Sequence, residues 1–170
     1  MKKSVSLAEL MIAISLIGVI VLGVTSFDVG SRQFLKASER KTQVLNEAAL
    51  ISDRITKDAL TAIGTVNQPA LTVAGGVLTI VQDSNANGRR DAADTTVVYQ
   101  LVGNQVQRVA NTTENLTNRA IGFVPTLMAD TNTVQIVLTL RFNPARAQDA
   151  FDNPEMAIQT NIEVPGWSLR

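Results

Sequence analysis

The sequence opens with MKKSVSLAELMIAISLIGVIVLGVTSF (residues 1–27), in which two lysines precede an almost wholly apolar run. The run carries no charge from Leu10 to Phe27, and its single acid, Glu9, lies near its front edge. As an α-helix the uncharged stretch spans roughly 27 Å, and the residues just before it supply the rest of the ~30 Å hydrocarbon core of a bilayer. The stretch therefore predicts a membrane-spanning helix over about residues 7–27.

The charges beside this helix predict its direction in the membrane. Lys2 and Lys3 lie on its short side, and the positive-inside bias keeps lysines in the cytoplasm. The residues after Phe27 are then expected outside the cytoplasm. A chain of 170 residues is long enough for this helix and one further domain of modest size.

Three interpretations of the segment stay open on the residues alone. A cleaved secretory signal ends in a small-residue site, for which VLGVTSFDVG (residues 21–30) offers only poor candidates. A plain signal anchor explains the apolar run but gives no reason for Glu9, because an acid in a lone membrane helix costs ~2.5 kcal/mol or more toward the centre. The third interpretation is that Glu9 meets a partner that arrives later.

The stretch KKSVSLAELMIAISLIGVI (residues 2–20) resembles the class III signal of type IV pilins and type II secretion pseudopilins. The shared features are a short basic leader, a small residue, and a hydrophobic helix with a glutamate at a fixed place. The resemblance implies that prepilin peptidase cuts between Ser4 and Val5 and that the new amino terminus on Val5 is methylated. In that family glycine is usual in place of Ser4, and phenylalanine or methionine is common in place of Val5. The resemblance also implies that Glu9 is an assembly residue, which pairs in lipid with the terminal amine of a neighbouring subunit.

The helix is expected to continue beyond the membrane. Small and apolar residues recur there at spacings of three, four or seven, which is typical of one face of an amphipathic helix. This predicted buried face comprises Phe34, Ala37, Val44, Ala48, Ile51, Ile55 and Ala59. Gly64 and the TVNQP that follows it supply a stop, so one long helix is predicted over residues 5–64. A small basic cluster predicts a solvated helix face or a contact with lipid head groups: Lys36, Arg40 and Lys41.

After Gly64 short alternating apolar runs predict β-strands. ALTVAGGVLTIVQ (residues 70–82) and TTVVYQLVGNQVQRVA (residues 95–110) predict two hairpins, which turn at Gly75–Gly76 and Gly103–Asn104. Three more runs complete a mostly antiparallel set: RAIGFVP (119–125), VQIVLTLRF (134–142) and MAIQTNIEV (156–164).

These elements predict an α+β fold in three parts: a leader over residues 1–4, the helix over residues 5–64 and a globular β-rich head over residues 65–170. A long N-terminal helix packed on a mostly antiparallel sheet is similar to the pilin fold. The order of the segments in the head resembles the minor pilins and pseudopilins of the J or W type. Tyr99 is expected in the core of the head or in cross-strand packing, and two N-x-Thr sequons, at Asn111 and Asn115, are expected in a polar loop.

Between the first two predicted hairpins lies DSNANGRRDAAD (residues 83–94), which fits the spacing of a calcium-binding loop. Oxygen ligands at alternate residues converge on one point when a glycine lets the backbone turn sharply, and Gly88 holds that sixth place. The predicted ligands are Asp83, Asn85, Asn87, the carbonyl of Arg89, Asp91 and Asp94. A bound Ca²⁺ and a metal-free turn both stay open, because aspartate, asparagine, serine and glycine are also simple turn formers.

The composition excludes several classes of function. The chain contains no cysteine and no histidine, which excludes disulfides, zinc–thiolate sites and catalytic triads that use a histidine. Lysine plus arginine and aspartate plus glutamate number 15 each, so no basic field indicates direct binding of nucleic acid. Asp91 and Asp94 are more typical of a turn than of paired catalytic carboxylates, and an enzyme is not expected.

The resemblance implies a structural subunit, a minor pilin or pseudopilin of a type IV pilus or a type II secretion pseudopilus. Its partners are then other such subunits, prepilin peptidase and the inner-membrane assembly platform. Before assembly it spans the inner membrane once with its head outside the cytoplasm, and afterwards it belongs to the filament. The alternative is a membrane-anchored extracytoplasmic binding module that displays the calcium-type loop.

Overall fold

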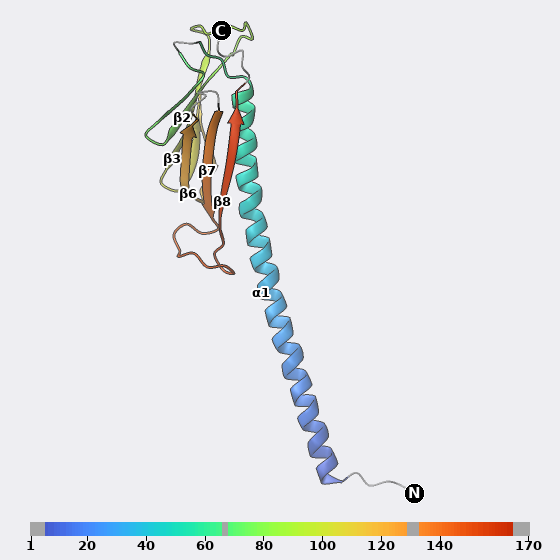
Figure 1. The fold of residues 1–170 in the computed structure, drawn as a ribbon. Coiled ribbons are helices and arrows are strands. Elements are labelled where there is room, and N and C mark those ends of the chain that lie inside the picture. Colours follow the sequence, from blue (N-terminus) through green and yellow to red (C-terminus); the bar gives the residue numbers. More distant parts are fainter. Residues whose placement is uncertain (1–5, 66–67, 129–132, 165–170) are drawn as a thin grey trace.

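The computed structural model describes residues 6–65, 68–128 and 133–164, and it has the outline of a long rod with a β-rich head beside one half (Figure 1). The rod is helix α1 (Leu7–Leu60), 54 residues in one run. At ~1.5 Å per residue it is roughly 80 Å long, which is far more than a membrane requires. The predicted long helix and its β-rich head are therefore confirmed.

The end of α1 differs from the prediction. The helix stops at Leu60, before Gly64, and the backbone N–H of Ile63 already donates to the carbonyl of Val81 in the head at 2.8 Å. Gly64 has another reason to be a glycine: a Cβ there would lie 2.3 Å from the backbone nitrogen of Ala70. The residue therefore permits two chain segments to approach closely after the helix has ended.

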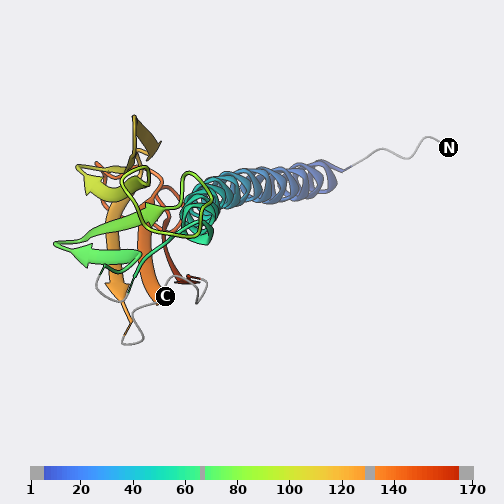
Figure 2. The ribbon, with the colours of Figure 1, turned by 90° about the horizontal axis from the view of Figure 1, so that it is seen from above.

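Eight strands follow the helix in the described part of the chain and form two antiparallel sheets. The first sheet has the order β1-β2-β3-β4-β5 and contains β1 (Leu71–Ala74), β2 (Val77–Gln82), β3 (Thr95–Val102), β4 (Gln105–Val109) and β5 (Thr113–Thr117). The second has the order β6-β7-β8 and contains β6 (Ala120–Leu127), β7 (Thr133–Arg141) and β8 (Glu155–Glu163). Seen from above, α1 lies beside the sheets rather than between them (Figure 2).

Both predicted hairpins are present. Ala74 pairs with Val77 across the Gly75–Gly76 turn, where both glycines have positive φ (58° and 78°). Val102 pairs with Gln105 across Gly103–Asn104, where Gly103 has φ of 61°. Both turns require a left-handed backbone conformation, which glycine adopts at little cost. The positions of the glycines in the sequence therefore determine where the turns form.

Strand β5 was expected to be part of a polar loop. Its sequence is TENLT, and Asn115, the start of the second sequon, lies within it opposite Gln107 of β4. Most of β5 is exposed, because it forms the outer edge of the first sheet, and only Thr117 is buried. An exposed edge strand needs no apolar alternation, so this element carried little signal in the sequence.

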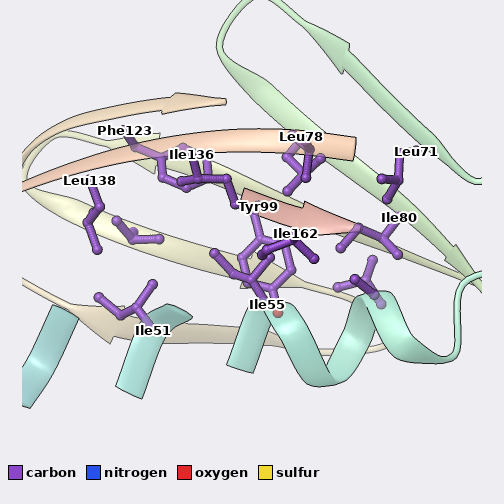
Figure 3. Packing of buried hydrophobic residues seen from close by; sticks show 14 of the residues in the cluster. Ile51, Ile55, Leu71, Leu78, Ile80, Tyr99, Phe123, Ile136, Leu138 and Ile162 are labelled. Carbon is purple, nitrogen blue, oxygen red and sulfur yellow. The ribbon is translucent and has the colours of Figure 1, made fainter. Parts of the chain in front are cut away.

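Side chains from α1 and from both sheets meet in one core (Figure 3). Ile51 and Ile55 of the helix pack toward Tyr99 of β3, Ile136 and Leu138 of β7 and Ile162 of β8. Tyr99 is fully buried, which confirms its predicted place. The core therefore joins the outer half of α1 to both sheets.

The predicted buried face of α1 is correct except at its start. Its members from Ala37 onward are buried: Ala37, Val44, Ala48, Ile51, Ile55 and Ala59. Phe34 is instead 67% exposed. The helical periodicity continues through Phe34, but no part of the described head reaches down to cover it.

Candidate functional site

From Leu10 to Phe27, in its N-terminal half, helix α1 exposes an uncharged and almost wholly apolar surface, and an exposed ion pair between Asp28 and Arg32 follows it. Its large apolar side chains between Leu7 and Leu35 are 53–78% exposed, which is unfavourable in water. Two hydroxyls in this half, on Ser15 and Thr25, donate back to the carbonyls of Met11 and Val21 at 2.9 Å. By length and composition the helix can cross a membrane, either as an anchor or as a signal sequence.

Glu9 lies in the first turn of α1 and has a local role that the sequence analysis missed. The Oγ of Ser6 accepts a hydrogen bond from the backbone N–H of Glu9 at 3.2 Å, so Ser6 is the N-cap. Serine followed by glutamate three residues later is the capping-box pattern, and an acid in the first turn also complements the helix dipole. The pattern was visible in the sequence. The predicted leader (residues 1–4) and the processing residues Ser4 and Val5 lie outside the described residues.

The outer half of α1 is held to the head by ion pairs along one flank. Three charged side chains spaced by seven residues each find a partner there: Arg40 with Asp152 (2.8 Å), Glu47 with Arg119 (3.2 Å) and Arg54 with Glu114 (3.5 Å). A spacing of seven residues returns to the same side of a helix. On another part of the interface Ser52 and Thr160 of β8 share a hydrogen bond of 3.3 Å.

A buried ionic cluster fastens the last turn of α1 to the first sheet. Asp58, 6% exposed, accepts hydrogen bonds from the hydroxyl of Tyr99 at 2.5 Å and from Nε of Arg108 at 2.6 Å. Burial alone would raise the pKa of Asp58, but the hydrogen bonds from Arg108 and Tyr99 and the charges of Arg108 and Arg54 outweigh it and lower the pKa. Burial and the neighbouring carboxylate raise the pKa of Tyr99. The cluster is therefore an ionised carboxylate held by two donors.

Arg40 also fixes the β7–β8 loop (residues 142–154). It donates to the backbone carbonyl of Asp152 at 2.7 Å, and its guanidinium lies 5.2 Å from the centre of the Phe142 ring. The guanidinium of Arg119 lies 4.9 Å from the same ring. The prediction of a solvated or lipid-facing residue is therefore wrong for Arg40, while Lys36 and Lys41 are exposed as expected.

Within this loop the side chain of Asn153 is hydrogen-bonded to several backbone carbonyls. Its buried side-chain nitrogen donates to three carbonyls, those of Asn143 (2.9 Å), Arg146 (3.1 Å) and Ala147 (2.8 Å). The loop consequently has a defined shape with no helix or strand of its own beyond an isolated bridge between Asp149 and Asn153, which is typical of a compact surface loop.

The predicted calcium loop forms the connection between β2 and β3, and several of its predicted ligands converge. The two carboxylate oxygens of Asp83 accept the backbone N–H groups of Asn87 (3.2 Å) and Gly88 (2.8 Å). Gly88 has φ of 69°, as the sharp turn in such a loop requires. Asn85 and Asn87 both point their side-chain nitrogens at Oδ2 of Asp91, at 3.1 and 2.6 Å. The loop thus closes around Asp91.

A cation could bind in this loop only if some of these hydrogen bonds were broken. The carboxylate of Asp91 accepts hydrogen bonds from the backbone N–H of Ala93 and from the amides of Asn85 and Asn87. These bonds lower the pKa of Asp91. Asp94 accepts the N–H of Asp91 with one oxygen at 2.8 Å, while its other oxygen is buried and has no hydrogen-bond partner among the described residues. Within the described ranges no group of three acidic side chains is close enough to hold a metal ion. Binding therefore requires the amides to turn their oxygens inward.

The two arginines of this loop differ in their contacts. Arg90 donates to the carbonyls of Gln68 and Pro69 at 3.1 and 2.9 Å, which draws its charge toward the segment before β1. The backbone N–H of Arg89 donates to the side-chain oxygen of Asn87 at 2.7 Å. This bond involves the N–H of Arg89 and not its carbonyl, so the predicted role of the carbonyl as a ligand stays a prediction.

Comparison of the chain with models of known protein families, with curated proteins and with solved structures finds no significant match.

Proposed function

We propose that this protein is a filament subunit, a minor pilin or pseudopilin that assembles through the exposed N-terminal half of α1. The observation that carries the proposal is the division of one helix into two unlike halves. One face of the outer half is buried against the head, and ion pairs connect it to the head. The large apolar side chains before Ala37 are instead exposed. A surface of this kind is stable only in lipid or against other apolar helices.

The assembly step proposed here uses Glu9. Cleavage after Ser4 leaves a positive amine on Val5, and a carboxylate from an adjacent helix neutralises it when helices pack side by side. Both groups are costly alone in lipid, so their pairing favours a defined register between neighbours. The sequence motif of residues 2–20 and the bare helix support this mechanism together.

The capping geometry makes a matched test possible. Glu9→Gln keeps a side chain that serves in a capping box but removes the charge, whereas Ser6→Ala removes the N-cap and keeps the charge. The measurement is the amount of each variant in filaments sheared from cells, relative to its amount in membranes. We expect Glu9→Gln to reach the membrane and be poorly incorporated, and Ser6→Ala to be incorporated nearly as the parent is. Equal incorporation of Glu9→Gln and the parent would overturn the role of the charge.

A second candidate, which need not exclude the first, is that the β2–β3 loop (residues 83–94) binds Ca²⁺. The observation that favours it is the buried carboxylate oxygen of Asp94, for which the described part of the chain offers no hydrogen-bond partner. A Ca²⁺ ion bound through Asp94 would satisfy that oxygen, once the amides of Asn85 and Asn87 have turned their oxygens toward the ion. The test compares thermal unfolding of the full chain in detergent with Ca²⁺ and with a chelator, for the parent and for Asp94→Asn. A midpoint that Ca²⁺ raises only in the parent supports the site, and equal midpoints in Ca²⁺ and chelator oppose it.

A further inference from the structure

The tip of the β2–β3 loop contains an asparagine followed by glycine, Asn87–Gly88, and both residues are exposed. Asparagine is among the chemically labile side chains. A following glycine favours ring closure, because it has no Cβ to hinder approach of its backbone nitrogen. The tip is therefore a place where the chain can react with itself.

The reaction in question is succinimide formation. The backbone nitrogen of Gly88 bonds to Cγ of Asn87, and the bond from Cγ to Nδ2 breaks. Ammonia leaves with the two amide hydrogens and the proton from Gly88. Water then adds to one of the two ring carbonyls and the ring opens, which yields either a normal carboxylate side chain or a backbone that runs through Cγ. Water is the sole co-reactant, and no oxidant or reductant is required.

In the folded loop both reacting groups are held by hydrogen bonds. The N–H of Gly88 donates to Asp83 at 2.8 Å, which stabilises the proton that must leave before the nitrogen can attack. The amide of Asn87 is fixed at both ends: Nδ2 donates to Asp91 at 2.6 Å, and Oδ1 accepts from the N–H of Arg89 at 2.7 Å. Rotation of Cγ toward Gly88 requires both of these bonds to break.

We propose that Asn87 is a deamidation site that Asp83 and Asp91 hold closed, and that conversion opens the loop irreversibly. After conversion, the 2.6 Å contact between the amide of Asn87 and Asp91 becomes a contact between two carboxylates, which repel each other. The number of carboxylates in residues 83–94 rises from three to four. The proposal concerns the head alone and does not depend on assembly through α1.

The experiment incubates the full chain in detergent at mildly alkaline pH and follows deamidation by mass spectrometry of the tryptic peptide Asp58–Arg89. This peptide also contains Asn85, which is followed by alanine and serves as an internal reference. The comparison is with the same peptide free in solution, where nothing holds the amide. Two variants each remove one of these bonds: Asp91→Ala releases Nδ2 of Asn87, and Asp83→Ala releases the N–H of Gly88.

Asp149→Ala is the matched control, because Asp149 also accepts backbone N–H bonds, from Phe151 and Asp152, in a different exposed loop. We expect Asn87 in the folded parent and in Asp149→Ala to react at least several-fold more slowly than in the free peptide. In Asp91→Ala or Asp83→Ala, with the head still folded by circular dichroism, the rate should rise above that of the folded parent toward that of the free peptide. Equal rates in the folded parent and the free peptide, or unchanged rates in both loop variants, would overturn the proposal.

Discussion

The hydroxyl of Tyr99 donates to the carboxylate of Asp58 at 2.5 Å, which joins the middle of β3 to the last turn of α1. Arg108 of β4, the cross-strand partner of Tyr99, donates to both oxygens of the same carboxylate, so Asp58 is bonded to two neighbouring strands. The acid stands at the C-terminal end of the helix, where the helix dipole disfavours it. It is stable there because both strands supply donors.

Removal of Asp58 should therefore destabilise the head strongly. Asp58→Ala leaves the guanidinium of Arg108 and the hydroxyl of Tyr99 without their acceptor, and breaking a buried ion pair typically costs about 3–5 kcal/mol. Tyr99→Phe removes one hydrogen bond to a charged group and should cost about 1.5–3 kcal/mol. Urea unfolding of the full chain in detergent measures both. A loss below ~1 kcal/mol in Asp58→Ala would show that the cluster does not hold the helix.

The same carboxylate predicts a dependence of stability on pH. Its pKa in the folded protein lies below the ordinary value of 3.8, so between these two values the unfolded chain binds more protons. The stabilisation is complete above the unfolded pKa and is lost as the pH falls through the folded pKa. Unfolding measured from neutral pH down into this acidic range should show a steeper loss of stability in the parent than in Asp58→Asn. Parallel curves would contradict this assignment.

Gly64 should tolerate no side chain. A Cβ there meets the backbone nitrogen of Ala70 at 2.3 Å, and backbone cannot move aside cheaply. Gly64→Ala is expected to lower the free energy of unfolding by at least about 1–3 kcal/mol. Gly30→Ala is the control, because no atom of the described residues lies within 4 Å of a Cβ placed at Gly30, and alanine favours helix. Similar free energies of unfolding for the two variants would show that the backbone near Ala70 can move away from a side chain at position 64.

Arg40 should control the β7–β8 loop. Arg40→Ala removes the bonds to Asp152 and the contact with Phe142, so the loop should open more often and trypsin should cut sooner after Arg146. Each ~1.4 kcal/mol of lost local stability corresponds to about a tenfold faster cleavage when opening is rapid. Lys41→Ala also removes one tryptic site but alters an exposed residue. Equal cleavage at Arg146 in both variants would contradict the role of Arg40.

The features predicted correctly from the sequence are those that local patterns determine. The apolar run, the repeat from Ala37 to Ala59 and the glycine turns at Gly75–Gly76 and Gly103 each depend on neighbours within a few residues. The end of α1 was predicted too late, because the chain joins the sheet at Ile63 and this contact depends on tertiary structure. Strand β5 was missed because its residues face water at a sheet edge.

The charged contacts were beyond prediction for a different reason. Asp58 and Arg108 are 50 residues apart, and Arg40 and Asp152 are 112 apart. Nothing in the spacing of charges along one chain says which of them meet after folding. The capping pair Ser6 and Glu9 is the exception, since its spacing of three residues is a recognised local motif.

The central claim, that this chain is a processed filament subunit, is tested most directly by the intact mass of the protein recovered from membranes of its host. We predict a mass that lacks Met1 to Ser4 and carries one added methyl group, with fragmentation that places the methyl on the amine of Val5. An amino terminus that is still Met1, or one created by cleavage beyond the apolar run, would contradict the account.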